Sequence, residues 1–181
     1  MGSMEKLVEY IKNENIIYLG KIPTNNIIID EKVREYCKDN KCGQYDKNFM
    51  CPPDIGEIKD FKNKLEKFNY CIVVLIKQKI LNKEDREEYF RLARKLHKIL
   101  LEIEKKGKDL GFENALALIA GNCKLCNPCK KVLGYRECPY PEYSRPSSES
   151  LGIDVINTVA KMGLEIEFKD TEVTWVGMII I

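Results

Sequence analysis

Histidine is almost absent from this chain, which has one, His97, among 181 residues. A histidine-based catalytic triad, or a metal site built from several imidazoles, therefore lacks its usual groups. The sequence also has no GxxxxGK[ST] motif, no GxGxxG motif and no radical-type C-x3-C-x2-C motif, so it indicates neither a nucleotide nor a flavin. His97 adjoins the apolar stripe of a predicted helix, where we expect an edge-of-core or surface residue rather than a metal ligand.

A strong net charge and a long apolar run are lacking too. Lys and Arg number 30 against 28 Asp and Glu, a net charge of +2, so no basic field favours nucleic acid or an anionic membrane. The clearest apolar runs, 71–76 and 178–181, have the length of strands rather than of membrane helices. No signal peptide is recognised, and residues 1–3 read as a tag remnant before Met4. We expect a cytoplasmic protein.

Cysteine, by contrast, is abundant, with eight in the chain. The length predicts one domain, residues 4–181, large enough to bury a core without a metal. In a cytoplasmic protein, so many cysteines indicate ligands or redox chemistry rather than a disulfide framework. Cys71 is the exception, because it opens a predicted buried strand and is expected to be a small core residue.

The most informative stretch is residues 121–148, GNCKLCNPCKKVLGYRECPYPEYSRPSS, with four cysteines. The spacing matches the ferredoxin run C-x2-C-x2-C-x3-C-P except that the last gap is longer, which can return the fourth cysteine to the same cluster. Four-cysteine zinc sites are the alternative, but a tight triple suits the corners of a cube better than one tetrahedral ion. The predicted ligands are Cys123, Cys126, Cys129 and Cys138.

A second cysteine-rich stretch, CKDNKCGQYDKNFMCPPD, covers residues 37–54. It is polar with almost no apolar periodicity, so it cannot pack by itself and something else should order it. Its cysteines are either incidental or a second site of three thiolates, and their density favours the site. The predicted ligands here are Cys37, Cys42 and Cys51.

Hydrophobic periodicity predicts an α/β fold: a two-layer sandwich with helices packed on a mainly antiparallel or mixed sheet, and both cysteine-rich loops at one edge. The apolar end of the chain is either a central strand or an interface, and the latter would make a homodimer. The predicted helices cover 5–13, 31–36, 58–68, 82–107 and 148–162, and the predicted strands cover 16–19, 70–76, 112–120, 164–168 and 175–181.

The segment Arg145-Pro146-Ser147-Ser148-Glu149 precedes a predicted helix. A helix N-terminus offers free N–H groups, and Arg145 beside it can bind an anion, a cluster sulfide or a substrate carboxylate, with Ser147 as a second cofactor contact. The alternative is a capping segment in which Arg145 pairs with a nearby acid.

Together, CGQYDKNFMCPP, GNCKLCNPC, Cys138-Pro139 and SRPSSESLGIDV resemble a family of predicted metal-binding proteins, a cysteine-rich domain of unknown function, from methanogenic archaea and other anaerobes. The resemblance runs from about residue 37 to residue 175. It implies iron–sulfur clusters bound through these cysteines, and it implies no particular reaction.

Two hypotheses from different classes follow. In the first, Cys123, Cys126, Cys129 and Cys138 hold a [4Fe-4S] cluster, and the protein carries electrons to or from a redox partner protein. In the second, three thiolates hold a second cluster with one open iron, which acts on a sulfur- or oxygen-containing small molecule. A zinc-stapled interaction module is a third alternative. One or two clusters, or zinc, are therefore the expected cofactors.

Overall fold

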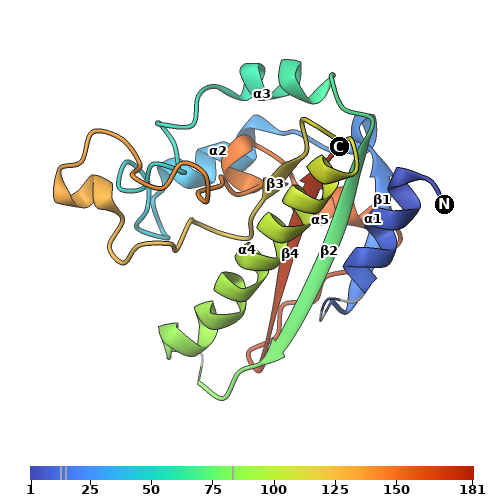
Figure 1. Cartoon of the computed structure of the whole chain (residues 1–181). Helices are drawn as coiled ribbons and strands as arrows, with labels where there is room; N and C mark the ends of the chain where they lie inside the picture. Colours follow the sequence, from blue (N-terminus) through green and yellow to red (C-terminus); the bar gives the residue numbers. More distant parts are fainter. Residues whose placement is uncertain (13, 15, 83) are drawn as a thin grey trace.

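The computed structural model of the chain describes every residue except Asn13, Asn15 and Lys83. Within the described part, four strands form one antiparallel sheet in the order β1-β2-β4-β3 (Figure 1). Their bounds are Tyr18–Pro23 for β1, Tyr70–Lys79 for β2, Leu116–Leu118 for β3 and Glu172–Ile180 for β4.

The two long central strands explain why the sheet forms. Residues 71–76 of β2 are all buried, without the polar alternation that one solvated face would give. This strand pairs along its whole length with β4, from Cys71 opposite Ile180 to Lys79 opposite Glu172. The apolar end of the chain is therefore in a central strand, the first of the two alternatives that the sequence left open.

Helices cover both faces of the sheet, each over its own core. One face carries α1, Ser3–Lys12, and the long α4, Arg86–Asp109. The other carries α3, Ile58–Leu65, and α5, Val155–Ala160. The predicted α/β class, the antiparallel sheet and its helical packing are confirmed. The continuous apolar run of β2 accounts for helices on two faces where the prediction had a single helical layer.

The predicted helix over 148–162 is interrupted. A 3-10 turn, η3, Glu149–Leu151, ends at Gly152, whose φ is +84°, and Asp154 then caps α5 by accepting from the backbone N–H of Asn157. A Cβ on Gly152 would lie 2.9 Å from Cδ1 of Ile58, so this position requires glycine for conformation and for space.

Other boundaries differ because local capping competes with periodicity. The helix predicted to begin at residue 82 begins at Arg86, where Asp85 caps α4 by accepting from two first-turn N–H groups. The predicted strand over 164–168 does not form, and Leu164 and Ile166 pack in an irregular segment against the core under α5. The predicted end of the first helix, Asn13, lies outside the described residues.

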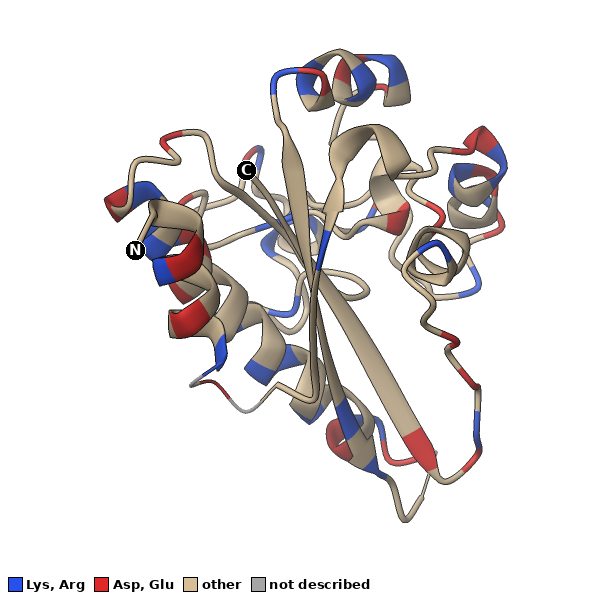
Figure 2. Cartoon of the chain, turned by 90° about the vertical axis from the view of Figure 1, so that its right-hand side faces the viewer, with Lys and Arg blue, Asp and Glu red and all other residues tan. Residues whose placement is uncertain are grey.

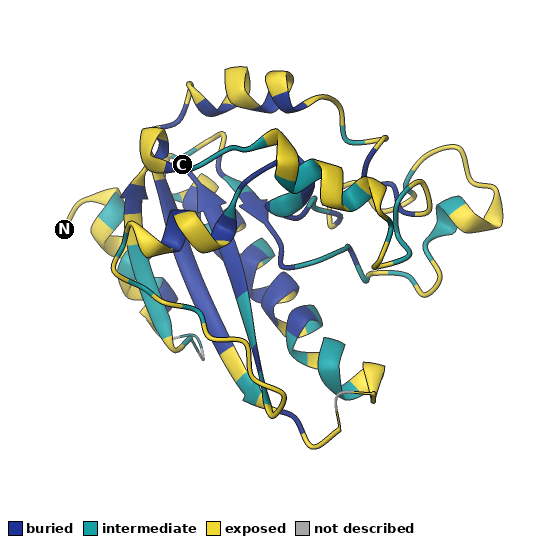
Figure 3. Ribbon diagram, turned by 180° about the vertical axis from the view of Figure 1, so that it is seen from behind, coloured by how far each residue is buried: buried dark blue, intermediate teal, exposed yellow. Residues whose placement is uncertain are grey.

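Two long connections project from one end of this body, and we call residues 37–57 the first cysteine segment and residues 121–148 the second (Figure 1). Figure 3 shows them as mainly intermediate and exposed beside a buried sheet. The second follows edge strand β3 and returns beside it, where the Ile119 N–H donates to the Pro146 carbonyl at 3.0 Å. The predicted place of the cysteine loops, at a sheet edge, is confirmed for this segment.

The charged side chains are dispersed over the helices and loops with both signs mixed, as the near-neutral composition predicted (Figure 2). None of the described helices is both long enough and apolar enough to cross a membrane.

Candidate metal centre

The two cysteine segments are joined by specific polar contacts. Asn48, only 2% exposed, donates from Nδ2 to the carbonyl of Cys123 at 2.9 Å. Further out, Nζ of Lys131 pairs with Asp46 at 2.7 Å and also with Asp54. One buried amide and a pair of outer ion pairs therefore hold segments that lie far apart in the sequence side by side.

The first cysteine segment brings its three thiols together. Cys37 lies in the last turn of α2, Glu31–Lys38, a helix capped by Asp30. Burial raises the pKa of Cys37 and raises that of Cys51 to about 12, and in both cases the nearby charge of Cys42 raises it further. Within this group, Cys51 is buried, Cys37 is half-buried and Cys42 is exposed.

The second cysteine segment forms a similar group around Cys123, which packs into the core under α4. Burial raises the pKa of the Cys123 thiol, backbone N–H groups of Leu125 and Arg145 that donate to its sulfur lower it, and the charges of Cys138 and Cys129 raise it again. Donors aimed at the sulfur favour a thiolate, which is the form that binds metal.

The two groups adjoin each other. The charge of Cys123 also raises the pKa of Cys51, so the innermost thiols of the two segments are neighbours. Further out, a cavity of about 620 Å³ is lined by Cys42, Cys126 and Cys129, which come from both segments. The structure thus gathers the seven predicted ligands in one region, all of them as free thiols.

Cys71 is separate from this region. It is fully buried in β2 and packs in the core under α3 and α5, and burial strongly raises its pKa. Its predicted role as a core residue is confirmed.

The thiols lie in one region without the close spacing of a bound metal ion. Among the described residues, no three Cys, His, Asp or Glu side chains converge closely enough to hold one metal ion. A zinc ion needs four ligands at about 2.0–2.3 Å, and an iron–sulfur cluster needs cysteines around its corners, so this spacing favours neither.

Beside Cys37, two buried polar atoms have no hydrogen-bond partner within the described chain, NH1 of Arg34 and Oε2 of Glu149. The charges of Glu149 and Arg34 both act on the pKa of Cys37, which places these side chains at the thiol group. Buried polar groups without partners are uncommon in folded proteins and mark places where a further group belongs.

Arg145 pairs with an acid, Glu104, that the sequence analysis did not name. Its guanidinium donates to both oxygens of Glu104, at 2.8 and 2.7 Å. Glu104, only 3% exposed, also accepts from the Ala117 N–H and from Lys108. Burial raises its pKa, but these donors outweigh burial and hold the pKa below its usual value. The sequence held one signal of this pair, because Glu104 is an acid on the apolar face of the helix, four residues after Leu100.

This ion pair matches the alternative in which Arg145 is part of a capping segment. Ser147 has a capping role as well, because its Oγ accepts from the Ser150 N–H at 3.1 Å. A contact of either side chain with a cofactor stays a prediction.

His97 is a buried residue of α4. It is 4% exposed, and its Nε2 is hydrogen-bonded to the Tyr143 carbonyl at 2.9 Å. Together with the Arg145–Glu104 pair, this bond fastens the end of the second cysteine segment to α4.

Lys124 places a cation within the thiol region. Its Nζ donates to the Asn122 carbonyl at 2.8 Å and lies 4.6 Å from the ring centre of Phe90. Burial lowers the pKa of Lys124 to about 8, against the opposing charges of Cys123 and Cys51. The side chain therefore balances part of any negative charge that the thiolates carry.

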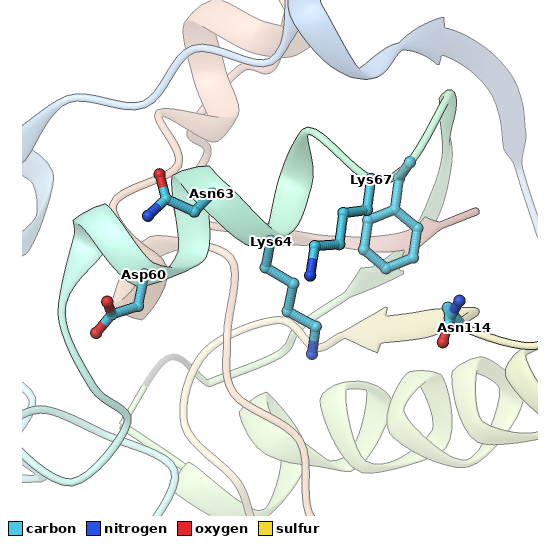
Figure 4. Close-up of a pocket in the computed structure, with 6 residues that line it drawn as sticks. Asp60, Asn63, Lys64, Lys67 and Asn114 are labelled. Carbon is cyan, nitrogen blue, oxygen red and sulfur yellow. The ribbon is translucent and has the colours of Figure 1, made fainter.

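A second cavity of about 620 Å³ lies by α3, remote from this chemistry (Figure 4). Lys64, Lys67 and Asn114 are among its lining residues, and no cysteine is among them. It is not part of the candidate metal centre.

Comparison with protein families agrees with this arrangement. The family described as "Predicted metal-binding protein (DUF2284)" matches residues 20–181, which include every cysteine discussed above. The chain belongs to the DUF2284 family. The resemblance stated from its motifs is therefore confirmed, and with it the prediction of a metal-binding protein. No curated protein and no solved structure matches this DUF2284 chain.

Proposed function

We propose that this DUF2284 protein is an iron–sulfur protein that acts in electron transfer in anaerobic metabolism. Its seven gathered cysteines would hold one or two [4Fe-4S] clusters, and a redox partner protein would exchange electrons with them. The observation that carries the proposal is the convergence of two separate segments on one region that contains every cysteine except the core residue Cys71.

The surroundings of Cys123 support a metal-bound thiolate. Two backbone N–H groups donate to its sulfur, and hydrogen bonds to cysteine sulfur are a main means by which proteins set cluster potentials. The number of thiols, seven, exceeds the four that a structural zinc ion uses. When bound, such clusters supply one-electron transfer.

An enzyme is the second candidate function. The first cysteine segment offers three thiolates, so a cluster held there would have one iron without a cysteine ligand. The cavity lined by Cys42, Cys126 and Cys129 gives a small molecule access to this region, which favours the enzyme hypothesis specifically. Its substrate would carry the sulfur or oxygen atom that an open iron accepts as a ligand.

The decisive measurement is iron, sulfide and zinc per chain on anaerobically purified protein. A triple variant, Cys37→Ser, Cys42→Ser and Cys51→Ser, is compared with Cys71→Ala, which removes a thiol outside the site. About eight irons in the natural protein and in Cys71→Ala, with about four in the triple variant, would support two clusters.

About four irons in the natural protein and almost none in the triple variant would mean that one cluster spans both segments. Stoichiometric zinc without sulfide would contradict the proposal and leave the zinc-stapled interaction module. Equal loss of iron from Cys71→Ala and from the triple variant would contradict the assignment of the ligands.

A further inference from the structure

Apart from its cysteines, the lining of the cavity beside the thiols carries an excess of positive charge. Its lining combines three cysteines with four cationic side chains, and the only acid in it is Glu87. The four cations come from the first cysteine segment, the start of α4 and the second cysteine segment. They are Lys47, Arg86, Arg94 and Lys124.

Most of this charge has no carboxylate partner within the described chain. Arg94 pairs with Glu87 at 2.5 Å, but no ion pair neutralises the other three cations. The guanidinium of Arg86 lies 5.9 Å from the ring centre of Phe90, and Nζ of Lys124 lies 4.6 Å from the same ring centre.

The rest of the lining is partly amide, from Gln44, Asn122 and Asn127, and partly apolar. Leu125 and Val132 are 41% and 54% exposed, and together with Phe90 and Pro128 they line the same cavity. A ligand that fits this cavity therefore has an apolar part as well as an anionic group.

We propose that this cavity binds a small organic anion, with a carboxylate or phosphate group on the cations and an apolar part against Phe90 and Leu125. The inference rests on the proposed function, because the wall of the cavity that holds Cys42, Cys126 and Cys129 would place the anion against the cluster. Arg and Lys recognise such oxyanions by charge-assisted hydrogen bonds.

The test is calorimetric titration of phenyl phosphate into anaerobically purified, iron-loaded protein, with phenol as the uncharged probe. The double variant Lys47→Gln, Arg86→Gln should bind phenyl phosphate about tenfold or more weakly. The matched control is Lys64→Gln, Lys67→Gln, which removes two charges from the other cavity of the same volume and should bind like the natural protein.

A variant with the opposite effect guards against loss of folding as an explanation. Glu87→Gln removes the only acid of the cavity and frees Arg94, so it should bind phenyl phosphate severalfold more tightly. Binding should also weaken as salt rises, because mobile ions screen the cations.

Failure of this inference is distinguishable from failure of the proposed function, because iron and sulfide are measured on the same samples. No binding to iron-loaded protein, or equal weakening in both double variants, would overturn the inference while the cluster stands. In that case the cations would serve to balance the thiolates. Protein without iron would contradict the cluster whatever the titration shows.

Discussion

The body of the molecule and its cysteine region are ordered in different ways. In the body, α4 and the central strands bury whole side chains, with Leu96, Leu100 and Ile103 at 0% exposure. In the cysteine region, the single turn η2, Lys130–Leu133, has no buried residue, and Val132 and Leu133 are more than half exposed. Burial of apolar side chains stabilises the body. A few polar contacts, together with the metal that we propose, stabilise the cysteine region.

This contrast separates stability from chemistry. A fully buried leucine contributes on the order of 2–3 kcal/mol by removal of apolar area from water, whereas one hydrogen bond contributes about 1 kcal/mol. Substitutions in the cysteine region should therefore impair metal binding more than folding. Substitutions in the core should impair folding more than metal binding.

The largest expected effect is in the body. Leu100→Ala leaves a cavity against the close-packed strand β4, where its side chain covers Gly177, and should lower the free energy of unfolding by about 4 kcal/mol. Because Leu100 covers β4 and is not one of the predicted ligands, metal content per folded chain should not change. Urea unfolding and metal analysis check both, with Ile156→Ala, a 42% exposed residue, as control. Loss of metal from folded Leu100→Ala would break the separation.

The second prediction tests the Arg145–Glu104 ion pair, which connects the cysteine region with the body. Glu104→Gln leaves Arg145 without its buried partner and should cost about 3 kcal/mol of unfolding free energy. Because Arg145 also donates its backbone N–H to Cys123, metal should be lost faster to a chelator. Lys108→Gln, on the exposed side of the same carboxylate, should cost less than about 1 kcal/mol. Similar chelation rates in the two variants would mean that the ion pair serves stability alone.

The smallest effect is a pH dependence from His97. Burial lowers its pKa below the ordinary 6.5, the Tyr143 carbonyl opposes this, and the charges of Arg145 and Lys124 add to it. Below pH 6.5 the unfolded chain binds a proton that the folded chain does not. The free energy of unfolding should therefore decrease as the pH falls from 6.5 to the pKa of His97 in the folded chain. Above pH 6.5 this contribution is constant.

Urea midpoints at pH 7.5 and 5.5 measure the effect, with His97→Asn as the comparison. The substitution should flatten the change between these two pH values. An identical pH profile in both proteins would show that His97 does not titrate between them.

Sequence reasoning succeeded where one signal dominates. The apolar run of β2 and the stripe of α4 predicted both elements, and the predicted loop position at a sheet edge holds for the second cysteine segment. It did worse where tertiary contacts decide. The alternation of 164–168 reads as a strand but has no strand beside it to pair with, and Gly152 divides a helix because Ile58 occupies the space above it.

The site shows the same division. The cysteines could be named from spacing, but the residues that hold their loops could not. Glu104, Asn48 and Lys124 are an ordinary acid, amide and base in the sequence, and only the fold gives them a buried partner or an aromatic platform. Partners separated by 41 or 75 residues leave no local pattern.

The second cysteine segment starts and finishes at the same place, where Ile119 pairs beside Pro146 and Ser147. Because its first and last residues lie next to each other at the sheet edge, the path of the residues between them does not affect the sheet. Lengthening such a loop costs little, about 0.6 kcal/mol for each doubling. The stretch between Cys129 and Cys138 can thus differ in length among chains of this kind while every strand keeps its register.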